Sequence, residues 1–197
     1  MIKAIIFDCF GVVLGNPYKL VLQDIMTKNP VLAEEVRGVQ HAADMGILSR
    51  DEAASYMSEK IGITKDEFFT IQNKGEVRNQ ELIERIHELR ADFKVAMVSN
   101  ISGRDRLDIR FEPGQLDSLF DTVIASGDVG HTKPEPEIYQ LAAEQLGVLP
   151  NECIMLDDIA EFCEGARAVG MQAIQFISTT QALEDLAAHI DRGGKTD

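Results

Sequence analysis

Short apolar runs rich in valine and isoleucine recur along the chain and are separated by longer stretches of helical period. They lie at residues 3–7, 94–98, 122–125, 153–156 and 172–176. Runs of this length that alternate with helices are typical of strands in a parallel sheet covered on both faces. In one intervening stretch, Ile138, Ala142 and Leu146 share a single helical face. The pattern therefore predicts an α/β fold in which helices flank a parallel sheet.

The pattern changes between Gly15 and about Gln80. No convincing strand occurs there, and the apolar positions recur only at helical spacing. Two helices of this stretch begin with capping boxes, Ser49 to Glu52 and Thr64 to Glu67. We therefore expect an all-helical insertion at residues 15–80, placed after the first strand of a core formed by residues 1–14 and 81–197.

The charge balance argues against binding to polyanions. The chain has 33 acidic and 19 basic residues and a formal net charge of −14 at pH 7. Such a protein repels nucleic acid and anionic membrane surfaces unless basic residues are concentrated in one place. The sequence shows no basic cluster. We expect a small-molecule ligand, with no nucleic-acid or membrane partner, and the sequence leaves monomer and homodimer open.

Three features favour a cytoplasmic location. The apolar runs stop far short of the ~20 residues needed to span a bilayer. Asp8 interrupts the first run before the apolar region of a signal peptide develops, so we expect no export signal. Cys9, Cys153 and Cys163 show neither a paired count nor metal-ligand spacing, and are expected to be small core residues.

Polar side chains directly follow three of the predicted strands: Asp8 after "KAIIF", Ser99 and Asn100 after "KVAMV", and Asp157 and Asp158 after "CIML". Lys133 lies in the loop "GDVGHTKPEPE" before a predicted helix. In an open parallel sheet, ligands bind beyond the carboxyl ends of the strands, near the switch in strand order. We expect these residues to converge on one site.

Four motifs occur in order: "IIFDCFGVVL", "VAMVSN", "KPEPEIYQLAAEQLGV" and "IMLDDIAEFCEGARAVGM". With them the chain resembles the haloacid dehalogenase superfamily, which consists mostly of phosphatases, and in particular subfamily I, whose small helical cap follows the first strand. The resemblance covers nearly the whole chain. It implies a Rossmann-like core, with residues 15–80 as a cap that closes over a small phosphorylated substrate such as a sugar phosphate.

The resemblance also implies Mg²⁺-dependent chemistry at Asp8. A carboxylate that attacks an anionic phosphoryl group needs positive charge to offset the repulsion, and Mg²⁺ with oxygen ligands supplies it. By resemblance, Asp8 is the nucleophile and forms an aspartyl-phosphate that water later releases. The implied metal ligands are Asp8, the backbone carbonyl of Phe10 and Asp158, with Asp157 binding directly or through water.

The other motif residues receive roles in the same way. Lys133 adds fixed positive charge to Asp8 and to the phosphoryl oxygens, which the Ser99 hydroxyl and the Asn100 backbone N–H hold in line. The cap residues that match a substrate-facing turn of relatives, and are therefore candidates for substrate specificity, are Asp44, Met45 and Gly46. Among the four histidines, only His131 is expected to come near the site.

The first motif departs from the superfamily pattern at Phe10. Most phosphatases of the superfamily carry a second aspartate there, which acts as general acid and then as general base. Loss of such a group typically costs ~10²–10⁴ in rate. The substrate must then have a good leaving group, or another group or an ordered water must supply the proton.

Two other readings stay open. 2-Haloacid dehalogenases of the superfamily carry an aromatic residue at this position and use the aspartate without metal, because halide leaves unprotonated. Without metal, however, Asp157 and Asp158 would face Asp8 with too little positive charge to neutralise them, which opposes a carboxylate nucleophile. The acid pair therefore favours the phosphatase. The last reading is a degenerate member that binds a phosphorylated ligand without turnover.

Overall fold

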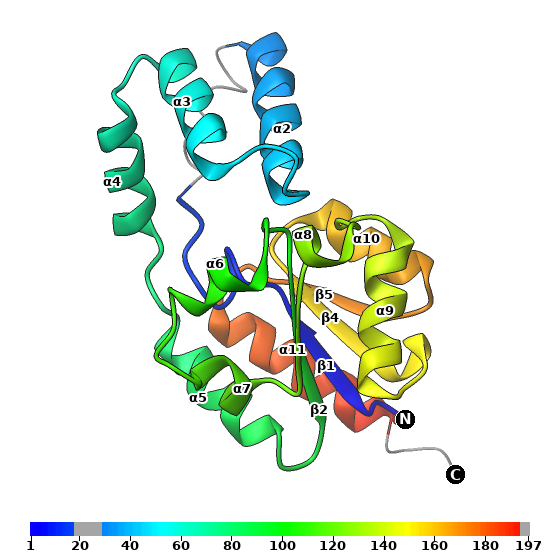
Figure 1. Ribbon diagram of the computed structural model, residues 1–197. Coiled ribbons are helices and arrows are strands. Elements are labelled where there is room, and N and C mark those ends of the chain that lie inside the picture. The colour runs from blue at the N-terminus through cyan, green and yellow to red at the C-terminus, as the bar shows by residue number, and fades with distance from the viewer. Residues whose placement is uncertain (18–28, 194–197) are drawn as a thin grey trace.

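A parallel sheet forms the centre of the protein (Figure 1), in a computed structural model that describes residues 1–17 and 29–193. Its strands are β1 (Ala4–Phe7), β2 (Lys94–Ser99), β3 (Thr122–Ala125), β4 (Cys153–Asp157) and β5 (Gln172–Gln175). Their order across the sheet is β3-β2-β1-β4-β5, with parallel pairing throughout. Each predicted strand is confirmed to within one residue at either end. The strand order reverses beside β1, which places the switch point between β1 and β4.

The strands are apolar throughout because helices cover both faces of the sheet. Ile5, Phe7 and Met97 point into the larger core on one face, whereas Ile6 and Met155 point into the core on the other. The first face is covered by α5 (Gln80–Leu89), α6 (Arg104–Asp108), α7 (Gln115–Leu119) and α11 (Thr179–Gly193). The second face is covered by α9 (Pro136–Leu146) and α10 (Ala160–Ala168). The predicted Rossmann-like α/β fold is thereby confirmed.

Two shorter elements complete the core, α8 (Ser126–Val129) directly after β3 and the 3₁₀ turn η1 (Pro150–Glu152) directly before β4. Helix α9 begins at Pro136, two residues beyond Pro134, so Lys133 lies in a loop rather than in the first turn of the helix. Within the described ranges, no helix is both long and apolar enough to cross a bilayer.

Three helices stand above the carboxyl ends of the strands in Figure 1: α2 (Pro30–Asp44), α3 (Arg50–Ile61) and α4 (Lys65–Gly75). Both predicted capping boxes are present, at the starts of α3 and α4. The helices share a small apolar core that includes Met57 and Phe68. The division into a core and an insertion at residues 15–80 stays a prediction, and residues 18–28 of that range lie outside the described part.

The two segments that connect the insertion to the core run side by side. Leu14 and Arg78 form an antiparallel bridge, and the Gly15 N–H donates to the Val77 carbonyl at 2.8 Å. On the core side, the Asn79 N–H donates to the Val13 carbonyl at 2.9 Å. The chain therefore leaves the core and returns to it at one point.

We expect Phe68→Ala to weaken the helical insertion more than the sheet. Phe68 is 4% exposed in the insertion's own small core, and removing a buried phenyl ring costs about 3–5 kcal/mol. Hydrogen exchange should accelerate in α2–α4 while β1, β2 and β4 stay protected. Ile71→Ala, on the same helix but 43% exposed, is the control and should change stability by less than about 0.5 kcal/mol. Equal acceleration in the sheet would contradict the expectation.

Candidate functional site

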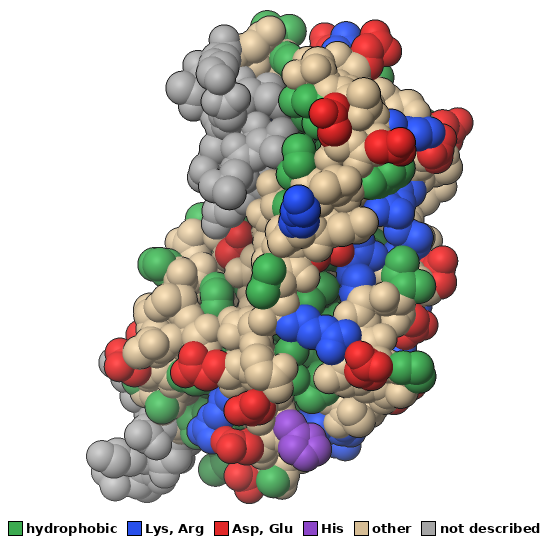
Figure 2. Space-filling view, turned by 90° about the vertical axis from the view of Figure 1, so that its left-hand side faces the viewer, with side chains coloured by type: hydrophobic (Ala, Val, Ile, Leu, Met, Phe, Trp, Pro, Cys, Tyr) green, Lys and Arg blue, Asp and Glu red, His purple; other side chains and the backbone are tan. Residues whose placement is uncertain are grey.

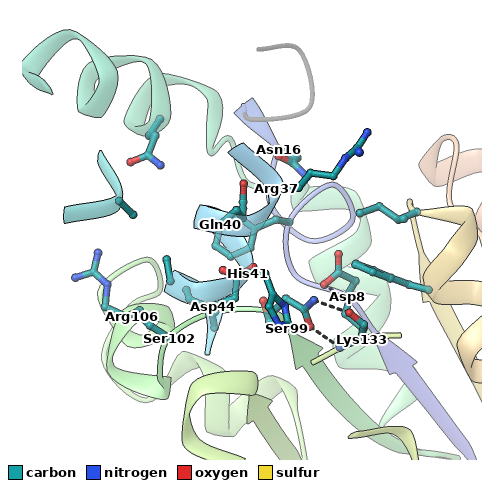
Figure 3. Close-up of a pocket in the computed structure, with 18 of the residues that line it drawn as sticks. Asp8, Asn16, Arg37, Gln40, His41, Asp44, Ser99, Ser102, Arg106 and Lys133 are labelled. Atoms are coloured by element: carbon teal, nitrogen blue, oxygen red, sulfur yellow. Dashed lines mark hydrogen bonds and ion pairs between the residues drawn. The ribbon is translucent and has the colours of Figure 1, made fainter. Parts of the chain in front are cut away.

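A cavity of about 550 Å³ lies between the helical insertion and the carboxyl ends of the strands. Asp8, Ser99 and Lys133 line it from the core, and His41 and Asp44 line it from α2 (Figure 3). The cavity therefore lies where the strand order switches, which is where the sequence analysis predicts the site. Its volume admits a small organic molecule in addition to a phosphate group.

Lys133 is buried between two carboxylates at the centre of this site. Its Nζ lies 2.6 Å from Asp8 Oδ1 and 2.6 Å from Asp157 Oδ2. Burial by itself would lower the pKa of the Lys133 ammonium, but the charges of Asp157 and Asp8 outweigh burial and raise it. Lys133 therefore stays charged and holds the two acids, which follow neighbouring strands, in one place.

One ammonium does not neutralise the acids around it. Burial raises the pKa of Asp8 to about 7, Lys133 opposes the shift, and Asp157 and Asp158 add to it. Burial likewise raises the pKa of Asp157, against the attraction of Lys133. A carboxylate nucleophile at Asp8 therefore requires further positive charge beside it.

The acids fit a hard divalent cation. Asp8, Asp157 and Asp158 each offer a carboxylate oxygen, and these oxygens lie within 4.8 Å of one another. All three residues are buried. Mg²⁺ prefers one or two carboxylates together with carbonyl and water oxygens. Asp8 and Asp158 can supply two, because Asp157 is engaged with Lys133. The role of the Phe10 carbonyl as a metal ligand stays a prediction.

Gly11 allows Asp158 to approach the loop after β1. Its φ of +98° is a backbone angle that residues with a side chain rarely adopt. A Cβ at this position would also lie 2.5 Å from the Asp158 carboxyl carbon. The glycine of the first motif thus leaves room for the acid of the fourth.

Ser99 and Asn100 lie beside this cluster and act in different ways. Ser99 is fully buried, and within the described residues its hydroxyl has no hydrogen-bond partner. The Asn100 side chain instead bonds the backbone of Lys133 twice, accepting from its N–H at 2.8 Å and donating to its carbonyl at 2.9 Å. Sequence reasoning gave Asn100 only a backbone role and missed that its side chain positions the lysine.

The insertion presents a different set of residues from the one predicted. Of the three specificity candidates, Asp44 lines the cavity and Met45 and Gly46 do not. Helix α2 ends at Asp44, and the chain turns away through Met45 and the left-handed Gly46. His131 does not line the cavity either, whereas His41 does. The His131 Nδ1 lies 3.4 Å from a carboxylate oxygen of Glu135. The prediction that His131 alone comes near the site is wrong.

Arginines gather around the cavity although the sequence shows no basic cluster. Four of them line it, Arg37, Arg50, Arg106 and Arg110, and Figure 2 shows Lys and Arg side chains collected where the insertion meets the core. Arg106 and Arg110 are neighbours along the chain, whereas Arg37 and Arg50 come from α2 and α3, so the fold brings the two groups together. Acidic residues line the same cavity, and with Lys133 the basic and acidic residues of its lining are equal in number. In a chain of net charge −14, such a balanced lining repels an anionic ligand less than the rest of the surface does.

The Phe10 ring forms part of the cavity wall. The Arg110 guanidinium lies 5.3 Å from the ring centroid and makes two hydrogen bonds of 2.8 Å to Glu76. Glu76 follows α4, so this stack joins the core to the end of the insertion. Phe10 thus packs against a neutralised ion pair and offers no proton.

We expect Mg²⁺ to raise the melting temperature of the wild-type protein, because it would relieve repulsion among the three acids. At 100 times its Kd, a ligand that binds only the folded state stabilises it by about 2.7 kcal/mol. Asp158→Asn should remove most of this shift. Glu137→Gln changes the exposed member of a second group formed by His131, Glu135 and Glu137, and as the matched control it should retain the shift. A shift lost in Glu137→Gln but kept in Asp158→Asn would place the cation elsewhere.

Known proteins resemble this chain over different lengths. Phosphatase MT3486 of Mycobacterium tuberculosis is 40% identical over 88 residues, which span 43% of this chain and 39% of that protein. Putative phosphatase YhcW of Bacillus subtilis is 28% identical over 187 residues, which span 88% of this chain and 83% of that protein.

Among solved structures, a HAD family enzyme from Bacteroides thetaiotaomicron, in complex with magnesium and inorganic phosphate, superposes with a TM-score of 0.67 at 20% identity. The match covers 89% of this chain and 94% of that one. At this identity the similarity supports the fold alone. A family model for haloacid dehalogenase-like hydrolases matches residues 2–170. This chain therefore belongs to the haloacid dehalogenase-like hydrolase family.

Proposed function

We propose that the protein is a Mg²⁺-dependent phosphatase of a small phosphorylated metabolite and acts through an aspartyl-phosphate on Asp8. The observation that carries the proposal is the set of three buried acids around the single ammonium of Lys133. Such a set has an excess of negative charge that a divalent cation balances, and the reaction of a carboxylate with a phosphoryl group requires this balance. The phosphatase names of the relatives support the same proposal.

The chain's own groups divide the work. Asp8 would attack phosphorus, and Lys133 would stabilise both Asp8 and the phosphoryl oxygens. Asp157 holds Lys133 in position through its 2.6 Å contact. The Ser99 hydroxyl is available to a phosphoryl oxygen. Asp8 and Asp158 would hold Mg²⁺, which supplies charge neutralisation when bound.

We also propose that the helical insertion acts as a cap over the substrate. Its helices supply His41 and Asp44 to the cavity, so substrate would be enclosed between two parts of the chain. Closure of such a cap excludes bulk water from the site.

The free, buried state of Cys9, Cys153 and Cys163 supports a cytoplasmic location.

A metal-free dehalogenase is the second candidate, and the aromatic Phe10 favours it. The geometry weighs against it, because the pKa of Asp8 is raised to about 7 without a further cation. A nucleophile that is half protonated at neutral pH is poorly suited to displace halide.

Hydrolysis of phosphate monoesters should require Mg²⁺ and disappear in Asp8→Asn, since the amide is no nucleophile. We expect a loss of more than about 10³-fold, measured as phosphate release with and without a chelator. Asp66→Asn, an exposed acid of α4, is the control and should keep full activity. Activity that survives chelation, or halide release from 2-chloropropionate without metal, would overturn the phosphatase proposal.

Ser99→Ala should separate stability from activity. The hydroxyl is buried without a partner in the described chain, so its removal should leave the melting temperature unchanged or higher. Loss of one hydrogen bond to a charged phosphate should lower kcat/KM by about 10–100-fold. The control Ser58→Ala removes a buried hydroxyl that donates to the Ser55 carbonyl, and should lower stability while kcat/KM stays constant. Unchanged kcat/KM in Ser99→Ala would remove Ser99 from the phosphate site.

A further inference from the structure

The proposed phosphatase lacks an obvious proton donor for its leaving group. In phosphoryl transfer the attacking and leaving oxygens lie roughly in line across phosphorus. The leaving oxygen would therefore point away from Asp8, out of the core and toward the insertion. Asp157 and Asp158 lie beside Asp8, on the side of the nucleophile, and Phe10 carries no proton. The donor must come from across the cavity.

Asp44 occupies that position. It is the last residue of α2 and lines the cavity, and Figure 3 shows it across the cavity from Asp8 and Lys133. The core fixes this end of the helix, because the Ser126 hydroxyl donates to the Asp44 carbonyl at 2.7 Å. Ser126 in turn accepts from the Ile101 N–H at 2.8 Å. The carboxyl of Asp44 is thus placed over the site by a contact between insertion and core.

The surroundings of Asp44 favour the protonated form of its carboxyl group. Burial raises the pKa of the Asp44 carboxyl well above its usual range, Lys133 opposes the shift, and Asp8 adds to it. Asp44 is not a member of the acid cluster that fits a metal. Within the described chain, no hydrogen bond engages its carboxyl group. A neutral carboxylic acid that faces an anionic site is suited to donate a proton to a leaving oxygen.

We propose that Asp44 is the general acid and base that replaces the aspartate missing at Phe10, an inference that rests on the proposed phosphatase function. In the first step Asp8 bonds to phosphorus, the bond from phosphorus to the ester oxygen breaks, and the Asp44 proton moves to that oxygen to release the alcohol. In the second step Asp44, now ionised, takes a proton from water as the water oxygen bonds to phosphorus and the bond from phosphorus to the Asp8 oxygen breaks. Inorganic phosphate leaves, and Asp8 and Asp44 return to their starting forms.

A general acid at Asp44 indicates which class of phosphate ester the protein hydrolyses. A positioned acid is needed when the leaving group is the oxygen of an ordinary alcohol, which departs poorly as an alkoxide. An acyl or anomeric phosphate has much less need of one. The substrate is therefore an ester of phosphate with an ordinary alcohol, such as a sugar phosphorylated at a hydroxyl other than the anomeric one.

The test compares Asp44→Asn with wild type on two probes, an alkyl phosphate and p-nitrophenyl phosphate. We expect kcat/KM to fall by about 10²–10⁴ on the alkyl ester and by less than about tenfold on the aryl ester. Glu35→Gln, an acid-to-amide change on the same helix whose acid pairs with Tyr56, is the matched control and should alter neither value. Equal losses on both esters would assign Asp44 a structural role and overturn the inference.

Two further measurements complete the test. In the wild type, log kcat/KM should depend only weakly on the pKa of the leaving alcohol, and a steep dependence would overturn the inference even if Asp44→Asn failed to fold. His41→Gln addresses the neighbouring donor on α2, and a loss confined to the alkyl ester in this variant but not in Asp44→Asn would transfer the role to His41. A wild type that hydrolyses neither ester would overturn the phosphatase proposal itself, whereas a loss pattern seen only in the variants concerns Asp44 alone.

Discussion

The structure of the site depends on the buried ammonium group of Lys133, which forms ion pairs with both Asp8 and Asp157. Burial of an ammonium is costly unless charge and hydrogen bonds compensate it, and here two carboxylates at 2.6 Å do so. Lys133 can contact both acids because β1 and β4 are neighbours and both end at the cavity. Asn100 then fixes the backbone of Lys133 from the end of β2. The ends of three strands and one loop are thus connected at the site through Lys133, by its ammonium group on one side and its backbone on the other.

The same ion pairs explain why the site favours a cation. Lys133 holds Asp8 and Asp157 together, Asp158 lies beside them, and one positive charge cannot balance three acids. The resulting repulsion is stored in the folded protein and would be released when a divalent cation binds. The arginines that line the cavity offset part of the acidic charge that an anionic ligand would meet there.

Much of the core could be predicted from the sequence because its signals are local. A run such as "AIIF" must be buried on both faces, and an acid directly after it must lie at the carboxyl end of the strand, where ligands bind. Asp8, Ser99 and Asp158 were placed at the site in this way, whereas Lys133 was placed there from its loop and its motif. The positions of His41 and Arg106 could not be predicted, because the rotation of a helix relative to the sheet is set by packing between distant segments. Met45 and Gly46 failed for a related reason, since the sequence placed the turn but not the direction in which it leaves the cavity.

The paired connecting segments between Val13 and Gly15 and between Val77 and Asn79 have a consequence for how this chain can vary. Because the insertion leaves and rejoins the core at one point, the core ends stay in register whatever is attached to them. A longer or shorter helical segment would change the entropy of closing this loop only slightly, by about 0.6 kcal/mol per doubling in length. The part of the chain that surrounds the organic half of a ligand is therefore free to diverge while the acids and Lys133 stay in place. Substrate choice and reaction chemistry are separable traits in such an architecture.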